Sequence, residues 1–381
     1  MVELADIVRE AGPAYVHTHA GHLLPSQRRA LADIADCRTA ALGGSLYRCD
    51  DCGALDYRYH SCRNRHCPKC QADRAQRWVE RVQSRLLPCE QYLLTFTLPH
   101  QLRAVAQRHQ RIVYAALLHE AAAAVQTVAD DRTWIGGTVG ILAVLHTWSR
   151  TLEYHPHVHL LVSAGGLSAD GAAWIAPAHC RFLLPGYLLS PIFRAKMRDA
   201  LLRAGVAEDV DARVWRRRWT VHVQQVGSGE HAALYLSRYV YRVALTNQRL
   251  AHFRDGHVTF RYTHARSHET RSATLPADAF LTRFLQHVLP RGFTKIRWYG
   301  LLSPGRRQDL ERARHLLALH AATASSPPPT TPSTNETGDT AARPSGNTAL
   351  SPGGTVALRC PVCSHGHRRL VQRYRPSRAP P

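Results

Sequence analysis

Two pairs of closely spaced cysteines constrain the fold of this chain more than any other feature. Cys49-x-x-Cys52 and Cys67-x-x-Cys70 are separated by fourteen residues. Each pair can bring two thiolates to one ion, and two such knuckles complete the tetrahedron that zinc prefers. The spacing therefore predicts one structural Zn²⁺ site in which the ligands are Cys49, Cys52, Cys67 and Cys70.

The other cysteines of the N-terminal part leave this ligand set partly open. Cys62 and His66 lie between the two knuckles and could replace one of the four ligands. We expect Cys37 and Cys89 to be ordinary buried thiols, because free cysteine behaves as a small apolar residue. The chain has no signal-peptide pattern and no run approaching the ~20 apolar residues of a membrane span, which predicts a cytoplasmic, nucleoid-associated protein. In that compartment the ten cysteines favour metal ligands over disulfides.

The C-terminal part of the chain changes in composition. We expect a helix at 306–320, whereas 321–357 is rich in Pro, Thr, Ser, Gly and Asn. Such a segment cannot bury enough apolar surface to order itself, which predicts a disordered linker. Residues 358–381 contain Cys360-x-x-Cys363 without a second cysteine pair. A small zinc knuckle and two plain thiols are equal alternatives there. The histidines that could complete such a knuckle are His365 and His367.

The charge of the chain indicates its partner. Lys and Arg outnumber Asp and Glu by 49 to 28, which gives a formal net charge of +21. So much positive charge repels itself unless a polyanion neutralises it, and nucleic acid is therefore the expected partner. A coding bias toward Arg would explain the excess of Arg over Lys, but not the shortage of acidic residues.

Basic side chains that could contact DNA gather at two places in the sequence. The group around the cysteine knuckles comprises Arg63, Arg65 and Lys69. The group in the WRRRW motif comprises Arg216, Arg217 and Arg218. The indoles of Trp215 and Trp219 flank this second group and could stack on unpaired bases. A solvated basic turn with two anchoring indoles is an equal alternative.

Hydrophobic periodicity predicts helices and strands that intermix without strict alternation. Residues 1–40 are expected to be helical, with Ser26 as the N-cap of one helix. A hairpin is expected around Asp255-Gly256. Strands are predicted at 92–98, 138–148, 157–163 and 220–226, and helices at 102–125, 190–204 and 230–245. The short turn at 149–156 makes the strands on either side of it antiparallel neighbours. The pattern predicts an α+β fold with an antiparallel sheet. The expected domains are a helical and zinc-binding, DNA-binding domain at 1–90 and a catalytic domain at 91–305.

Two histidines in one of these strands form a candidate metal site. His157 and His159 are two residues apart, so both imidazoles lie on the same face of the strand. Val158, Leu160 and Val162 then point into a core on the other face. Two imidazoles on one sheet face can bind a divalent ion. A His-x-His pair by itself is weak evidence, because half-buried histidines are common.

A predicted helix adds candidate nucleophiles. Tyr235 and Tyr239 are four residues apart and share one flank of the helix at 230–245, and Tyr241 points away. Arg242 lies on the same flank as the two tyrosines and is a further candidate for contact with DNA. Two tyrosines packed on a half-exposed helix are the alternative. A phenol with its pKa of about 10 is a poor nucleophile when protonated. A metal ion that polarises a phosphodiester and stabilises the departing 3′ oxygen would complement it, and covalent attachment would conserve the bond energy for rejoining.

These motifs resemble a known family. HPHVHLLV followed by a Tyr-x-x-x-Tyr helix resembles the HUH superfamily of single-strand endonucleases, and the wider pattern resembles its IS-ninety-one-like rolling-circle transposases of bacterial insertion sequences. The similarity runs in order through residues 25–305. The matching segments are CRTAALGG at 37–44, SCRNRHCPKCQ at 61–71, YLLTFTLP at 92–99, HTWSRTLEYHPHVHLLV at 146–162, YLSRYVYRVALTNQRL at 235–250 and FLQHVLPRGFTKIRWYGLL at 284–302.

The resemblance implies a zinc-binding N-terminal domain, a catalytic domain with an RRM-like antiparallel sheet, and a 5′-phosphotyrosyl intermediate on single-stranded DNA at insertion-sequence ends. Carried onto this chain, it makes His157 and His159 ligands of a catalytic Mg²⁺ or Mn²⁺, and Tyr235 and Tyr239 the nucleophiles. The motif does not fix a third metal ligand. We favour His146, because the preceding strand should lie beside the histidine pair, with His155 and Glu153 as alternatives.

Three other functions compete with this interpretation. A replication initiator or conjugative relaxase would often carry a helicase, but none of the three lysines follows a glycine, so a P-loop is absent from this sequence. A zinc-containing DNA-binding regulator without catalysis would show no tyrosine-dependent cleavage. A transposase with a carboxylate triad is disfavoured, because acidic residues are scarce between 90 and 250.

Overall fold

The computed structural model describes residues 2–70, 82–179, 183–208, 210–228, 244–264, 267–324 and 359–376. It confirms the predicted α+β fold with antiparallel sheets. The chain divides into two compact units, one formed by residues 1–37 and 62–319 and the other by residues 38–61 and 320–381. This division differs from the boundary expected at residue 90, because a segment near the N-terminus joins the C-terminal residues.

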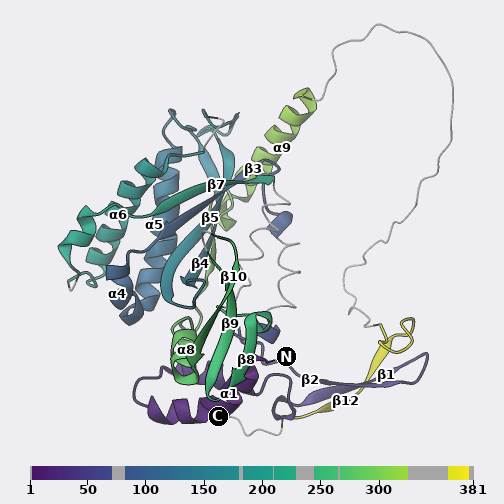
Figure 1. Cartoon of the computed structure of the whole chain (residues 1–381). Coiled ribbons are helices and arrows are strands. Elements are labelled where there is room, and N and C mark those ends of the chain that lie inside the picture. Colours follow the sequence, from purple (N-terminus) through teal and green to yellow (C-terminus); the bar gives the residue numbers. More distant parts are fainter. Residues whose placement is uncertain are drawn as a thin grey trace, which may run out of the picture. The chain divides into compact units, whose positions relative to one another are not determined.

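The larger unit is built around one antiparallel sheet (Figure 1). Its strands follow the order β11-β4-β5-β3-β7, and β6 pairs with β5 outside this path. The bounds are β3 Glu90–Thr97, β4 Thr138–Trp148, β5 Tyr154–Leu167, β6 Trp174–Ile175, β7 Val221–Ser228 and β11 Ile296–Gly300. The predicted antiparallel pairing of β4 with β5 across a short turn is confirmed. Apolar and β-branched residues fill these central strands because both faces of the sheet are covered.

Two long helices cover one face of the sheet, α5 (Gln110–Ala129) and α6 (Gly186–Arg203) (Figure 1). The predicted helix at 102–125 is in fact two, because α4 (Arg103–Arg108) ends at His109, whose backbone leaves the helical region. By length and composition α5 could cross a membrane, contrary to the sequence expectation. Its buried side chains pack into the core of the sheet, as in the central helix of many globular proteins.

A smaller apolar cluster covers part of the opposite face of the sheet. It includes Leu93, Leu142, Val144 and Leu161 from the strands. Leu310 of α9 (Arg307–Ala324) and the residues just after β11 pack against them. Residues 321–324, expected in the linker at 321–357, belong to α9 instead, and the rest of that expected linker lies outside the described residues.

A third cluster joins the N-terminal helices to a hairpin sheet within the same unit. The helices are α1 (Leu4–Thr18), α2 (Pro25–Ala35) and α8 (Ala277–Leu285), and the strands are β8 (Leu250–Arg254), β9 (His257–Thr263) and β10 (Thr270–Pro276). The predicted turn at Asp255-Gly256 is confirmed, with positive φ angles of 49° and 68° at its two residues. Ser26 is not an N-cap. The helix begins at Pro25 instead, because proline is well suited to the first helical position.

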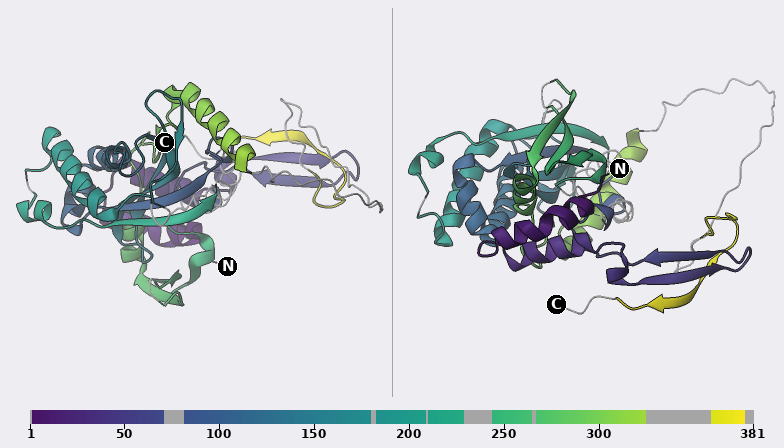
Figure 2. Two further views of the ribbon diagram at one scale, coloured as in Figure 1. Left: turned by 90° about the horizontal axis from the view of Figure 1, so that it is seen from above. Right: turned by 60° about the horizontal axis from the view of Figure 1, so that its bottom comes forward.

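The smaller unit is a three-stranded antiparallel sheet, in the order β12-β1-β2. Its strands are β1 (Gly44–Cys49), β2 (Leu55–Tyr59) and β12 (Arg368–Tyr374). Figure 2 shows β12, in yellow, running beside the β1–β2 hairpin. Short 3-10 helices complete the described elements: Ala40–Leu42, His100–Leu102, Ala212–Arg216, Asn247–Arg249 and Pro304–Arg306.

Candidate active site and cysteine clusters

Three histidines meet on adjacent central strands of the large sheet. His146 on β4 lies directly opposite His157 on β5, and His159 follows two residues along. One ring nitrogen of each residue lies within 4.8 Å of those of the other two. The ring centroids of His146 and His159 are 4.7 Å apart, and those of His157 and His159 are 4.9 Å apart. Three imidazoles that converge in this way could bind one metal ion.

The strand alternation explains why these three side chains share a face. Leu142, Val144 and His146 alternate along one face of β4, and Leu161 belongs to the same apolar cluster as Leu142 and Val144. The face is therefore aliphatic at one end and histidine-rich at the other. The intervening residues of β5, Val158 among them, lie in the core on the opposite face, as predicted from the sequence.

Hydrogen bonds at Nδ1 orient two of the rings. His157 donates from Nδ1 to the carbonyl oxygen of His155 at 2.7 Å, so the neutral ring keeps its lone pair on Nε2. Nδ1 of His159 is 2.9 Å from Oγ1 of Thr95, which lies opposite it on β3. Outer partners of this kind fix the orientation of a ligating imidazole. The ring of His146 stacks on that of Trp148, with a centroid distance of 4.8 Å.

Burial keeps two of these imidazoles neutral. It lowers the pKa of His157 to about 4, with a further contribution from His155, against the opposing hydrogen bond to the His155 carbonyl. It also holds the pKa of His159 well below its ordinary value, with His157 adding to the effect. The neutral imidazole is the form that binds metals, so the site is prepared for a cation at neutral pH.

His146 lies with His157 and His159, whereas the two alternative third ligands have other surroundings. His155 instead contacts Arg103, with 2.8 Å between Nδ1 and Nη2. Glu153 is exposed in the turn between β4 and β5. Neither belongs to the histidine group. The antiparallel pairing of β4 with β5, expected from the short turn between them, brings His146 beside His157.

Both candidate nucleophiles, Tyr235 and Tyr239, belong to the predicted helix at 230–245. Tyr235, Tyr239 and Arg242 lie within 229–243, outside the described residues, and so does most of the predicted helix at 230–245.

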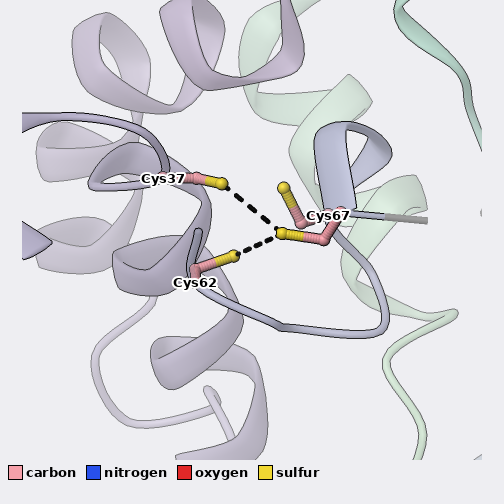
Figure 3. Close-up of side chains that lie close together, drawn as sticks. Cys37, Cys62 and Cys67 are labelled. Carbon is pink, nitrogen blue, oxygen red and sulfur yellow. Dashed lines mark hydrogen bonds between the residues drawn. The ribbon is translucent and has the colours of Figure 1, made fainter. Parts of the chain in front are cut away.

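Eight of the nine cysteines in the described residues form two clusters, and the predicted single site is wrong. Cys37, Cys62, Cys67 and Cys70 form one group, with every pair of sulfur atoms within 4.8 Å. Figure 3 shows the side chains of Cys37, Cys62 and Cys67 close together. Sγ of Cys70 is 3.6 Å from that of Cys37 and 3.5 Å from that of Cys62. Thiolates bound to one tetrahedral zinc at ~2.3 Å lie about 3.8 Å from one another, so the spacing fits such an ion.

Cys49 and Cys52 lie in the other cluster, with Cys360 and Cys363. The sequence could not show this, because the knuckle nearest in sequence is not the partner in space. Cys37, expected to be an ordinary thiol, is a member of the first cluster, and Cys62 joins it as one alternative allowed. His66 does not: its Nε2 accepts a hydrogen bond from the Leu289 amide at 3.3 Å, and burial lowers its pKa to about 3.

The basic residues predicted to contact DNA fall into two classes. Two of those near the knuckles are engaged within the protein. Arg65 donates to the carbonyl oxygens of Pro290 and Phe293, and Nζ of Lys69 is 2.5 Å from a carboxylate oxygen of Glu3. These contacts hold the Cys67–Cys70 knuckle to the rest of its unit. Arg63 is exposed.

The WRRRW motif presents three exposed guanidinium groups, those of Arg216, Arg217 and Arg218. Trp219 does not point outward: it is buried in the main core, and its indole N–H donates to the Val214 carbonyl at 3.1 Å. The expectation that Trp219 stacks on bases is therefore wrong, and the anchoring alternative holds for it. Trp215 is partly buried against the same core.

These features define a basic α+β protein with clustered metal-ligand side chains. Residues 140–309 match the family described as a putative transposase, and residues 7–98 match a transposase zinc-binding domain. The chain is 38% identical over 340 residues to a putative transposase, y4qJ, of Sinorhizobium fredii, covering 83% of this chain and 84% of the relative. It is 31% identical over 288 residues to the transposase for insertion sequence element IS801 of Pseudomonas savastanoi, covering 70% and 68%. No solved structure matches.

The chain belongs to the IS91 (IS-ninety-one) family of transposases, as the resemblance indicated. It is therefore a DNA-processing enzyme. The zinc-binding match and the cysteine clusters together support structural zinc in the protein.

Proposed function

We propose that this transposase nicks and rejoins single-stranded DNA at insertion-sequence ends, by rolling-circle-type transposition through a 5′-phosphotyrosyl intermediate. The observation that carries the proposal is the convergence of His146, His157 and His159 on one face of the sheet. A divalent ion held by these imidazoles could assist phosphodiester cleavage. Similarity to a transposase for an insertion sequence element supports the choice of DNA ends as substrate.

The connectivity of the sheet supports the RRM-like interpretation of the catalytic domain. Along the chain the elements follow β3-α5-β4-β5-α6-β7, and in space the strands follow β4-β5-β3-β7. This is a βαββαβ arrangement in which both helices cover one face. The opposite face is then left to carry the histidines.

The three histidines would hold the catalytic ion. When bound, the ion would polarise the scissile phosphate and stabilise charge on the departing oxygen. Of the two ions expected, the all-imidazole donor set favours Mn²⁺, because Mg²⁺ prefers oxygen ligands. Thr95 and the carbonyl of His155 would keep two of the rings in their ligating orientation.

Tyr235 and Tyr239 are the proposed nucleophiles. In the cleavage step one phenol oxygen bonds to phosphorus, the P–O3′ bond breaks, and the 3′ oxygen leaves with a proton as a hydroxyl. In the rejoining step a 3′ hydroxyl attacks the same phosphorus and the tyrosine regains its proton. Two nucleophiles on one helix flank could handle two strands in turn.

DNA backbone binding is assigned to exposed arginines. Arg63 and the run of Arg216, Arg217 and Arg218 carry guanidinium groups at the surface, where they can reach phosphates. The +21 charge of the chain favours the same partner.

The test is incubation of the full chain with labelled single-stranded DNA from the element's own end and Mn²⁺ or Mg²⁺. The proposal requires a covalent protein–DNA adduct that peptide mass spectrometry locates on Tyr235 or Tyr239. Tyr241→Phe is the matched control and should keep the adduct. DNA binding without any tyrosyl adduct would instead indicate a non-catalytic regulator, and an adduct on Tyr241 would refute the assignment.

A further inference from the structure

The C-terminal segment forms part of the same sheet as the hairpin near the N-terminus. β12 runs antiparallel to β1, with Gly44 opposite Tyr374 at one end and Cys49 opposite Arg368 at the other. This register brings the knuckle that precedes β12 to the knuckle that follows β1. The domain matches cover residues 7–98 and 140–309, so the C-terminal knuckle lies outside both.

The four sulfur atoms of these knuckles have the spacing of a metal site. Sγ of Cys49 is 3.8 Å from that of Cys363, and Sγ of Cys52 is 3.7 Å from that of Cys360. All four lie within 4.8 Å of one another. The separation expected between thiolates on one tetrahedral zinc is about 3.8 Å.

Backbone amides support thiolates at both knuckles. The Asp51 amide donates to Sγ of Cys49, and the Val362 amide donates to Sγ of Cys360, each at 3.4 Å. The Gly366 amide donates to Sγ of Cys363, also at 3.4 Å. Amide donors of this kind favour the charged sulfur that a metal requires.

Further contacts tie the two knuckles together. The Asp50 amide donates to the His367 carbonyl at 3.0 Å, and the His367 amide donates to the Asp50 carboxylate at 2.7 Å. A Cβ added at Gly366 would overlap Sγ of Cys49, so only glycine allows the chains to approach this closely. The imidazole of His367 is in no ligand group, and His365 lies with Asp51 beside Cys363 on the exposed side.

In the described part of the smaller unit, no apolar core is present that could hold these strands by itself. Among its described residues, only Cys49 and Cys360 have buried apolar side chains. Leu55 and Val362 are exposed at 64% and 71%. A unit this small without buried aliphatic side chains needs a metal or another crosslink to stay folded.

We propose that Cys49, Cys52, Cys360 and Cys363 bind a second structural Zn²⁺, which closes a zinc ribbon from segments that lie some three hundred residues apart in the chain. The soft thiolate donors and the tetrahedral spacing favour zinc over Mg²⁺ or Mn²⁺. The site is separate from the Cys37 cluster and independent of the proposed cleavage chemistry.

The first test is metal analysis of the purified full-length protein. The double variant Cys360→Ser/Cys363→Ser should contain one equivalent of zinc less than the unsubstituted chain. Cys89→Ser, which removes a thiol outside both clusters, should lose none. A double variant with an unchanged zinc content would overturn the proposal.

The second test does not depend on a variant that might misfold, since all ligands are kept. A protease site is inserted between residues 325 and 358 of the full chain, the chain is cut there, and the products are separated by size. The C-terminal fragment should stay bound in zinc buffer and dissociate when 1,10-phenanthroline removes the metal. A fragment that leaves in the presence of zinc, or stays after the metal is gone, would refute the metal closure.

Discussion

His146 faces His157 across the β4–β5 ladder, with their ring centroids 5.4 Å apart and their ring planes at 88°. Eleven positions separate these two residues in the sequence, so no short local spacing joins them. The pairing of two adjacent strands brings them together. The metal site we propose is therefore a property of the sheet register as much as of the His-x-His motif.

The first prediction follows from this pair. His146→Ala should reduce metal-dependent cleavage by more than the roughly 100-fold typical for loss of an outer-shell partner, because a ligand itself is removed. Binding to single-stranded DNA should change little, since it depends on exposed arginines. Cleavage assays and gel shifts on the same preparations measure both. His155→Ala is the control, and equal loss of cleavage in that variant would favour His155 as the ligand.

Thr95 provides a second prediction. Thr95→Val removes the hydroxyl that contacts Nδ1 of His159 at 2.9 Å and keeps a similar volume. Affinity for Mn²⁺ should fall by about 10- to 100-fold, since the orientation of the ring is lost. Isothermal titration with Mn²⁺ measures this directly. Thr97→Val, on the same strand opposite His157, should have a much smaller effect; similar losses in both variants would indicate general damage to the strand.

A third prediction concerns the approach of the two knuckles in the smaller unit. Gly366→Ala places a methyl group against Sγ of Cys49 and 2.5 Å from Cβ of Asp51. The variant should lose one equivalent of zinc, or bind it far more weakly. Metal analysis after dialysis against a mild chelator shows the difference. Gly305→Ala, where an added Cβ meets nothing within 4 Å, should keep the full zinc content.

A fourth prediction concerns acid stability. His287 is fully buried, with Nε2 donating to the Leu152 carbonyl at 3.1 Å and Nδ1 3.2 Å from the Thr147 hydroxyl. Burial lowers its pKa from 6.5 to about 4, although the hydrogen bond to Leu152 opposes this shift. The unfolded chain therefore takes up this proton at a higher pH than the folded chain. The contribution of neutral His287 to the free energy of unfolding is full above pH 6.5 and is lost as the pH falls toward 4.

Between pH 6.5 and pH 4, the shifted pKa of His287 lowers the free energy of unfolding by about 3 kcal/mol. Urea unfolding at pH 7.5 and at pH 5 should show a smaller drop in the free energy of unfolding for His287→Gln than for the unsubstituted chain. Identical drops would mean that the imidazole of His287 titrates normally in the folded protein.

The exposed arginines give the fifth prediction. Replacing Arg216, Arg217 and Arg218 together by alanine should weaken binding to single-stranded DNA and make its salt dependence shallower. The slope of log K against log salt should fall by about 2, if each arginine contacts one phosphate. Arg213→Ala, which removes an exposed cation already paired with Asp211 on the same turn, is the control. An unchanged slope in the triple variant would exclude this turn from the DNA interface.

Local patterns in the sequence were sufficient for much of the fold. The alternation around His157 predicted both the strand and the face of its side chains, and Asp255-Gly256 predicted a hairpin that the structure confirms. The predicted ends of helices were wrong where a neighbouring residue is better suited to begin or to interrupt a helix. Pro25 takes the start of α2 from Ser26, and His109 interrupts a helix whose alanine-rich pattern runs on.

The cysteine ligands show why spacing alone misleads. Cys52 and Cys67 lie close together in the sequence. The hairpin between Cys37 and Cys62 nevertheless places Cys49 and Cys52 beside the C-terminal knuckle. The partner of the Cys49–Cys52 knuckle follows from the pairing of β1 with β12, and the composition of neither strand predicts this pairing. Trp219 is a similar case, because a WRRRW motif does not indicate which of its indoles the core will cover.

The pairing of β1 with β12 also has a consequence for synthesis. The hairpin that carries Cys49 is synthesised first, and the third strand of its sheet, β12, follows some three hundred residues later. The ribbon cannot close until β12 has been translated, and the loop that it closes is long. A chain that stops before β12 would thus yield a transposase whose N-terminal hairpin lacks its third strand.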